Sequence, residues 1–304
     1  MGSAPLVVPV LEAIVKDGHD IVGVYTSPDR AVGRGRKLQQ SQVKTYAIRE
    51  NLPVFQPYSI NSSESYYKLK AISPAVIVVA AYAQLLSPKI LSIPRFGVVN
   101  VHPSMLPSYR GPSPIASSIL GGGQMTGVTL MLLEPEMDTG PILAQLEVPI
   151  NKEDTSQSLG DKLFYKGAEL LIQTLPKWTD GTIDPRQQDH TSATITRKFL
   201  KADGLLNWNK AAVVLWREMR AFYPWPSTFT FLNSKRIKLI ESSILDDTVT
   251  AKPGTVIDLS NNGLRVATGK GTLIIYRLQV EGKKIINANE FLMGDPGIIG
   301  SIFG

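Results

Sequence analysis

Residues 97–107 (GVVNVHPSMLP) begin as a run of apolar, β-branched residues and turn polar within a few positions. The apolar run predicts a buried strand, and its polar end carries an amide at Asn100 and an imidazole at His102. Pro103 and Pro107 stiffen the chain that follows, because proline fixes its own backbone angle and has no amide hydrogen. We therefore expect this strand to end at a functional site.

Similar apolar runs, separated by segments of helical periodicity, fill the first 176 residues. Strands that alternate with helices are typical of a doubly wound α/β fold with a mainly parallel sheet. Such a sheet binds its ligands beyond the carboxyl ends of its strands, so Asn100 and His102 are expected in that crevice. The predicted strands are residues 21–26, 76–80, 97–101 and 127–133, and the predicted helices are residues 38–50, 62–72, 114–120 and 155–175.

The C-terminal part has a different pattern. Residues 177–206 lack a sustained period and are rich in Thr, Asp and Gly, which is typical of a linker. After a predicted helix at 207–221, about five short strands favour a small β-barrel, such as the oligonucleotide-binding (OB) barrel. We therefore predict a catalytic domain over 1–176, a linker over 177–206 and a C-terminal barrel over 207–304. The strands expected in the barrel are residues 228–232, 235–243, 254–259, 264–268 and 272–279.

Composition excludes several classes of site. The sequence contains no cysteine, which excludes disulfides, thiolate-bound metals and a thiol nucleophile. With only three histidines, in unrelated contexts, we expect no metal. No run of about 18 apolar residues could span a bilayer, and the first residues lack the pattern of a secretory signal. We therefore expect no membrane partner and a cytoplasmic location, or an organellar matrix after processing.

The positive charge is concentrated in the C-terminal third. Residues 1–197 hold 18 basic and 17 acidic side chains, whereas residues 198–304 hold 14 basic and 9 acidic ones. A basic module attached to a neutral one favours a polyanionic partner, and the alternative is an ordinary basic surface.

A carboxylate is expected beside the imidazole. Asp138 lies in residues 135–140 (PEMDTG), directly after another predicted strand, so it should reach the same edge of the sheet as His102. A carboxylate near histidine favours the charged ring and fixes its tautomer, which suits a proton shuttle. Asn100 adds an uncharged donor for an oxyanion. This set favours direct acyl transfer, while Ser104 keeps hydrolysis through a covalent intermediate open as a minor alternative.

Two motifs resemble those of a known family. Residues 100–107 (NVHPSMLP) are similar to the Asn-x-His-x-Ser-Leu-Leu-Pro signature of folate-dependent formyltransferases, and residues 137–140 (MDTG) resemble their Asp-Thr-Gly segment. The resemblance implies a catalytic centre of Asn100, His102 and Asp138. It also implies 10-formyltetrahydrofolate as co-substrate and no metal. The residues implied for the folate pocket are Val79, Ala81, Tyr82, Ser104, Met105, Leu106 and Pro107.

Weaker resemblances concern the acceptor. Residues 27–38 (SPDRAVGRGRKL) resemble the basic loop that methionyl-tRNA formyltransferases insert into the tRNA acceptor arm. Residues 220–226 (RAFYPWP) and 280–284 (VEGKK) resemble the family's junction into its barrel and a late basic turn. They imply formylation of the α-amino group of initiator methionyl-tRNA, for translation initiation, and we expect a monomer. The residues implied in tRNA binding are Arg34, Arg36, Lys37, Arg220, Lys283 and Lys284.

Two alternatives stay open: a formyltransferase that acts on a nucleotide-linked amino sugar, and a catalytically inert RNA-binding protein on the same scaffold. The chain also departs from the family's pattern. Ala83 stands where glycine is usual, and residues 1–3 (MGS) stand where the family's first apolar strand ends in a turn. We therefore expect the first strand of the sheet to be missing and its neighbours to keep unpaired backbone groups.

Overall fold

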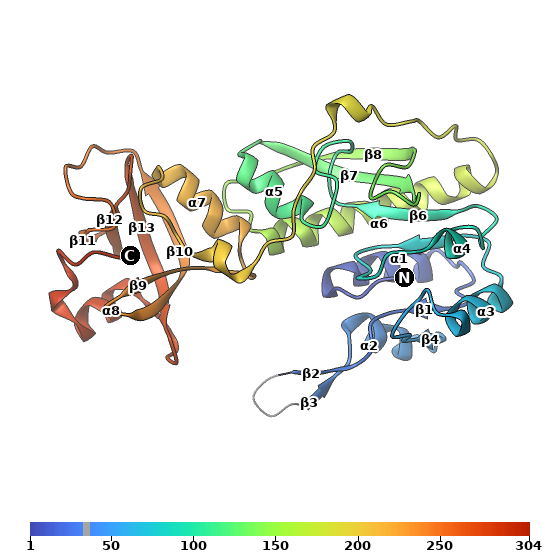
Figure 1. The fold of residues 1–304 in the computed structure, drawn as a ribbon, viewed down its shortest axis with the longest axis horizontal. Coiled ribbons are helices and arrows are strands. Elements are labelled where there is room, and N and C mark those ends of the chain that lie inside the picture. Colours follow the sequence, from blue (N-terminus) through green and yellow to red (C-terminus); the bar gives the residue numbers. More distant parts are fainter. Residues whose placement is uncertain (33–36) are drawn as a thin grey trace. The chain divides into compact units, whose positions relative to one another are not determined.

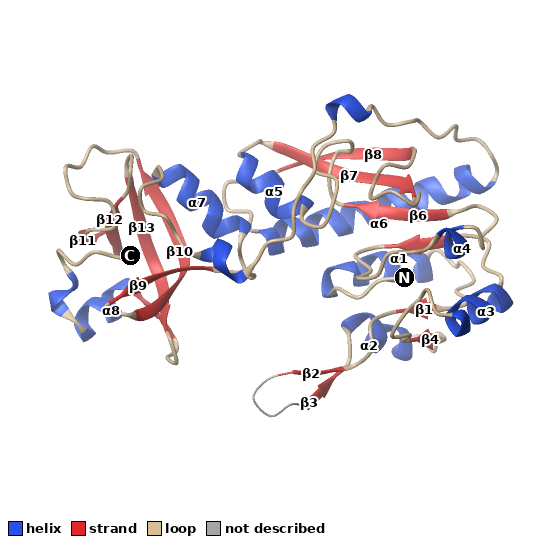
Figure 2. Cartoon of the chain, in the orientation of Figure 1, coloured by secondary structure: helices blue, strands red, loops and turns tan. Residues whose placement is uncertain are grey.

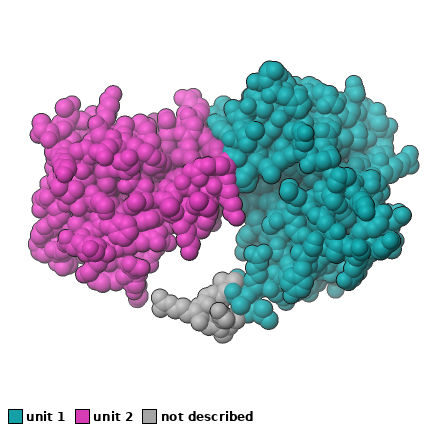
Figure 3. Space-filling model, in the orientation of Figure 1, with its two compact units in different colours: residues 1–114, 125–149, 160–196 teal, residues 115–124, 150–159, 197–304 magenta. Residues whose placement is uncertain are grey.

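The structure, a computed structural model, describes residues 1–32 and 37–304. These residues form two compact units, coloured separately in Figure 3. The units are not divided by one cut in the chain, because two short segments before residue 160 belong to the second unit. The division predicted from the sequence, at 177–206, is simpler than this and stays a prediction. Unit 1 comprises Met1–Pro114, Met125–Pro149 and Gly160–Thr196, and unit 2 comprises Ile115–Gln124, Ile150–Leu159 and Arg197–Gly304.

The central sheet of unit 1 is mixed, with strand order β5-β6-β7-β8. β5 and β6 are parallel, as the alternation of strands and helices predicted, whereas β7 runs antiparallel to both of its neighbours. The four strands lie side by side in Figure 1. Their bounds are Ile77–Val79 for β5, Val98–His102 for β6, Met125–Leu132 for β7 and Ile142–Pro149 for β8.

One long helix, α6 (Ser156–Thr179), packs against a face of this sheet (Figure 2). Gly167 makes the close approach possible, since a Cβ at that position would lie 2.7 Å from Val101 Cγ1 and 3.1 Å from Val128 Cγ1. These contacts fix which residues of β6 and β7 are covered. By the alternation of side chains along a strand, Asn100 and His102 of β6 lie on the face opposite Val101.

The sheet is interrupted where the first strand was expected to be missing. β1 (Val24–Tyr25) pairs with β4 (Val54–Phe55), and only residues 1–3 join β1 to the edge of β5. Gly2 N donates to Tyr25 O at 2.9 Å, and Met1 O accepts from Ala80 N at 3.0 Å. Beyond these residues lies a cavity of about 490 Å³, lined in part by residues 21–25 and 75–78. The segments on either side of residues 1–3 therefore border a largely apolar cavity.

The helices of unit 1 begin at serine caps in two cases. Ser41 Oγ accepts from Lys44 N, and Ser62 Oγ accepts from Ser65 N, which satisfies amides that have no partner inside the helix. The helix predicted from residue 38 therefore begins later, because residues 37–39 form a strand. The bounds are Val8–Lys16 for α1, Gln42–Arg49 for α2, Ser63–Ile72 for α3 and Pro88–Leu91 for α4. The next helix, α5 (Pro114–Gly121), belongs to unit 2 from residue 115 onward. The hairpin strands are Arg30–Val32 for β2 and Lys37–Gln39 for β3.

Unit 2 contains a six-stranded antiparallel sheet with order β11-β12-β13-β10-β9, and β14 pairs with β13. All five strands predicted for the barrel are present. The strand bounds are Thr228–Leu232 for β9, Lys235–Leu245 for β10, Val256–Ser260 for β11, Gly263–Ala267 for β12, Thr272–Val280 for β13 and Ile285–Asn287 for β14. The helices of this part are α7 (Ala212–Ala221) and α8 (Ala288–Gly294).

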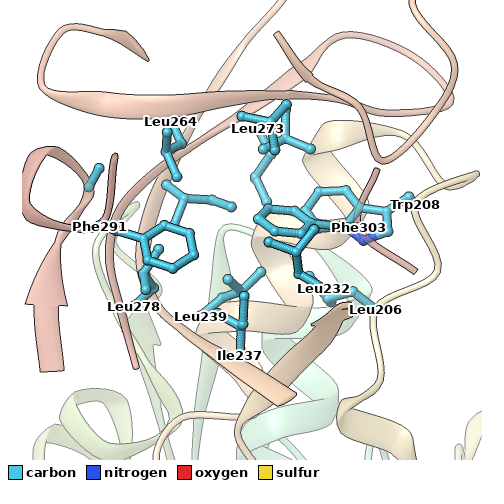
Figure 4. Close-up of a cluster of buried hydrophobic side chains, with 14 of the residues drawn as sticks. Leu206, Trp208, Leu232, Ile237, Leu239, Leu264, Leu273, Leu278, Phe291 and Phe303 are labelled. Carbon is cyan, nitrogen blue, oxygen red and sulfur yellow. The ribbon is translucent and has the colours of Figure 1, made fainter. Parts of the chain in front are cut away.

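An apolar cluster forms the core of unit 2. Figure 4 shows the ring of Phe303 beside Trp208 in this cluster. The two rings stack with their centroids 5.7 Å apart. Trp208 also donates from Nε1 to Thr230 Oγ1 at 3.0 Å, so its polar atom is satisfied inside the core. The helix was predicted to start at residue 207. α7 instead starts after Trp208, because the side chain of Trp208 packs into the core. Within the described residues, no helix is both long enough and apolar enough to cross a bilayer.

Candidate active site

The structure brings His102 and Asp138 together. His102 ends β6 and is 4 % exposed, and its Nδ1 lies 3.7 Å from Asp138 Oδ1. The other ring nitrogen, Nε2, lies 3.2 Å from Tyr109 O. Because a carbonyl oxygen can only accept, Nε2 carries the hydrogen, and the Nδ1 edge faces the carboxylate.

Burial sets the charge of this ring. Burial lowers the pKa of His102 below its ordinary value of 6.5, against the opposing effects of Asp138 and of the Tyr109 carbonyl. The site without substrates therefore holds a neutral imidazole near pH 7. The sequence led us to expect a charged ring beside Asp138, and that expectation was wrong because desolvation outweighs an attraction across a gap too long for a hydrogen bond.

The loop that carries Asp138 has an unusual backbone. Asp138 has φ of 54°, a region that non-glycine residues seldom occupy, and its Oδ2 accepts from Gly111 N at 2.7 Å. Two residues later, Gly140 approaches the main chain so closely that a Cβ would lie 2.0 Å from Leu132 O. The residues Asp-Thr-Gly thus form a tight turn that holds the carboxylate at the edge of the sheet.

Asn100 lies two residues before His102 on β6, so both side chains lie on the same face of the strand. In the register of the sheet, Asn100 stands between Val79 of β5 and Met131 of β7. Its side chain is partly exposed and has no hydrogen-bond partner within the described part of the chain. An unpartnered amide on this face is free to donate to a substrate oxygen.

The loop after β6 is held by its own hydrogen bonds. Ser104 is fully buried and donates from Oγ to Ser108 O at 2.6 Å, so its hydroxyl is not aligned as a nucleophile. Thr129 Oγ1 accepts from Leu106 N at 3.1 Å and donates to Ser104 O at 2.7 Å. Gln145 Nε2 donates to Leu106 O at 2.8 Å. The loop over residues 104–107, which was predicted to line the folate pocket, is therefore held in place by these hydrogen bonds.

The other predicted part of that pocket follows β5. Val79 is buried, whereas Ala81 is exposed and has φ of 40°. The hydroxyl of Tyr82 is buried without a hydrogen-bond partner in the part of the chain that the structure describes. Burial also raises the pKa of Tyr82 to about 12. The phenol oxygen of Tyr82 is closed off from solvent within the apolar core, whereas the turn at Ala81 is exposed. The role of these residues in a folate pocket stays a prediction.

The residues predicted to bind tRNA fall into three groups. Arg34 and Arg36 lie outside the described residues, and Lys37 opens β3. Lys283 and Lys284 are exposed in the turn between β13 and β14. For these residues the role in tRNA binding stays a prediction.

Arg220 makes contacts within the protein. Its Nη1 donates to Asp154 O at 3.1 Å and to Asn151 O at 3.4 Å, and its guanidinium lies 3.9 Å from the centre of the Trp216 ring. These contacts are those of a residue that stabilises unit 2. A role for Arg220 in tRNA binding is not tested by them and stays a prediction.

Sequence reasoning missed the segment after α6. Residues 183–196, expected in a linker, belong to unit 1 and pair with its loops. Arg110 N donates to Thr194 O at 2.8 Å, and Thr196 N donates to Arg110 O at 2.7 Å. Gln188 and the side chain of Arg110 are both buried. One signal in the sequence pointed to Arg110, namely its position in residues 109–111 (YRG) next to the signature. No such signal pointed to Gln188.

Comparison with known proteins agrees with the resemblance found in the sequence. Residues 1–175 match the sequence profile of formyl transferases, and residues 198–296 match that of the formyl transferase C-terminal domain. The methionyl-tRNA formyltransferase of Chloroflexus aurantiacus is 43% identical over 295 residues, which cover 97% of this chain and 95% of the relative. That of Dehalococcoides mccartyi (strain CBDB1) is 41% identical over 304 residues, which cover 100% and 97%.

A solved structure shares the fold. The N-formyltransferase of Helicobacter canadensis, crystallised with folinic acid and dTDP-3-aminofucose, superposes with a TM-score of 0.68 over 90% of this chain and 96% of its own, at 21% identity. Among the described residues, no group of three or more His, Asp or Glu side chains is arranged to hold a metal ion. The family profiles cover both parts of the sequence and the relatives match nearly its whole length, so the chain belongs to the formyl transferase family.

Proposed function

We propose that this protein transfers a formyl group from 10-formyltetrahydrofolate to the α-amino group of initiator methionyl-tRNA, for translation initiation. The observation that carries the proposal is the approach of His102 to Asp138, at 3.7 Å, in a chain whose relatives at 41–43% identity are methionyl-tRNA formyltransferases. We propose a cytoplasmic location and a monomeric state for the same enzyme.

In the proposed reaction, the uncharged amine attacks the formyl carbon, and the bond from that carbon to the folate nitrogen N10 breaks. The side-chain amide of Asn100 donates to the formyl oxygen as that oxygen gains negative charge. Neutral His102 accepts the proton that the amine loses and then passes it to N10, so no proton is left over. The resting protonation state of His102 suits this order of events, because a ring that is already charged could not accept a proton.

Asp138 has two roles in this scheme. Its negative charge stabilises the imidazolium that forms when His102 accepts the proton. The hydrogen bond from Gly111 N to Oδ2 holds the carboxylate in its position beside the ring. The burial of His102 and the partial burial of Asp138 strengthen this attraction, because interactions between charges grow as water is excluded. The site is therefore arranged to favour the charged ring only during the reaction.

The charge distribution supports a nucleic acid as the acceptor. Residues 198–304 carry 14 basic and 9 acidic side chains. Contacts between basic side chains and phosphates release counterions, so the affinity for tRNA should fall steeply as salt is raised.

A direct acceptor assay tests this function. Purified protein is given 10-formyltetrahydrofolate and either charged initiator methionyl-tRNA or a dTDP-linked amino sugar, and the formylated product is measured. We expect product with the tRNA alone and a rate that falls with salt. Product with the amino sugar alone would replace our acceptor with the alternative one. RNA binding without product from either acceptor would show an inert protein on the same scaffold.

A further inference from the structure

Gln188 is a buried side chain, 5 % exposed, that connects two loops of the site. Its Nε2 donates to Asp138 O at 2.9 Å and to Gly140 O at 2.7 Å. Its Oε1 accepts from Arg110 Nε at 3.0 Å and from Arg110 Nη2 at 2.7 Å. Only this orientation of the amide matches donors with acceptors, because carbonyl oxygens only accept and a guanidinium only donates. The carboxamide thus joins Arg110 to the backbone on both sides of Thr139.

These contacts hold a strained part of the chain. Asp138 has φ of 54°, and a residue in this region stays there only when its surroundings hold it. Gln188 holds the carbonyls of Asp138 and Gly140, while Gly111 N holds the Asp138 carboxylate from the neighbouring loop. Since Arg110 directly precedes Gly111, the Arg110–Gln188 contact fixes one loop against the other.

The surroundings of Arg110 also explain why an amide stands at position 188. Arg110 is 6 % exposed, and its side-chain partners among the described residues are the neutral Gln188 oxygen and His190 Nδ1, at 3.2 Å from Nη2. A glutamine satisfies the guanidinium with its oxygen and two carbonyls with its nitrogen. A carboxylate in its place could satisfy the guanidinium but not the carbonyls.

We propose that Gln188, oriented by Arg110, is a positioning residue that sets the separation of Asp138 from His102. This inference rests on the function proposed above. Gln188 acts through the backbone of Asp138, because both the oxygen and the nitrogen of its amide are already bonded within the protein. A displacement of about 1 Å in a catalytic group can cost roughly 100-fold in rate, so the loss of this contact should be measurable.

The test is the substitution Gln188→Glu, which keeps the size of the side chain and its pairing with Arg110 but replaces the donor by an oxygen. That oxygen would face the carbonyls of Asp138 and Gly140 and push the loop away. We expect kcat to fall by about 10- to 100-fold while KM for both substrates changes by less than about threefold. The matched control is Gln187→Glu, since Gln187 is exposed and has no hydrogen-bond partner among the described residues. Should Gln188→Glu fail to fold, Gln188→Met takes its place with the same expectation.

A double-mutant cycle separates positioning from a merely structural role. In the Asp138→Asn background, Gln188→Glu should cost less than about threefold in kcat, because the charge that it positions is already absent. Parental kcat in Gln188→Glu alone, or an equal loss in both backgrounds, would overturn the inference and leave the proposed function standing. Parental kcat in Asp138→Asn would instead overturn the proposed role of Asp138 itself.

Discussion

Replacing Asp138 by asparagine should lower the pKa of His102 still further. The substitution keeps an oxygen that can accept from Gly111 but removes the negative charge 3.7 Å from His102 Nδ1. At that distance the attraction is about 1 kcal/mol in water and about 4 kcal/mol at an effective dielectric constant of roughly 20. The pKa of His102 should therefore fall further below its ordinary value when this attraction is removed.

The pKa can be measured by NMR titration of the histidine ring protons. The chain contains only three histidines, so each signal can be assigned by single substitution. The ring signals of the exposed His19, which lies outside the site, should be unchanged by Asp138→Asn and serve as the internal control. A titration midpoint of His102 that stays the same or rises in Asp138→Asn would refute the reasoning that this carboxylate stabilises the charged ring.

Three further predictions concern stability. Burial lowers the pKa of His102, so the unfolded chain binds a proton near pH 6.5 that the folded chain binds only at lower pH. Stability in urea should therefore fall as the pH drops below that value, and His102→Gln should flatten the dependence. Phe303→Ala should cost about 3–5 kcal/mol, because the ring is 2 % exposed and stacks on Trp208; Tyr58→Ala, at an exposed position, should cost far less. An extension of about five β-branched residues before Met1 should raise the thermal midpoint by pairing the open strand edges, whereas a glycine-rich extension of equal length should not.

The strands next to the site could be predicted because their local pattern is strong. The apolar run before Asn100 has the length and composition of a buried strand, and in the structure it forms the start of β6. β8 and α1 were missed. β8 follows β7 directly and pairs with it antiparallel, and a pattern of strands that alternate with helices does not predict two consecutive strands. The helix predicted from residue 207 failed in its first turn because Trp208 is drawn into the core.

The site could be predicted only as far as its motifs reach. His102 and Asp138 lie in recognisable segments at strand ends, and the structure places them 3.7 Å apart. The charge of His102 could not be foreseen, because it depends on burial, which the sequence does not state. Gln188 contacts Arg110 across 78 positions of sequence, in a segment without periodicity. Such contacts leave no local pattern.

The central claim is that His102 carries the proton in formyl transfer. The most direct test is the rate of a single turnover with saturating 10-formyltetrahydrofolate and charged initiator methionyl-tRNA, compared between the parent, His102→Ala and the control His19→Ala. We expect a loss of about 100- to 10,000-fold for His102→Ala and parental rates for His19→Ala, as for removal of an acid–base group. A His102→Ala protein that turns over within about threefold of the parent would contradict the account, since the loss of such a group should cost at least tenfold more than that.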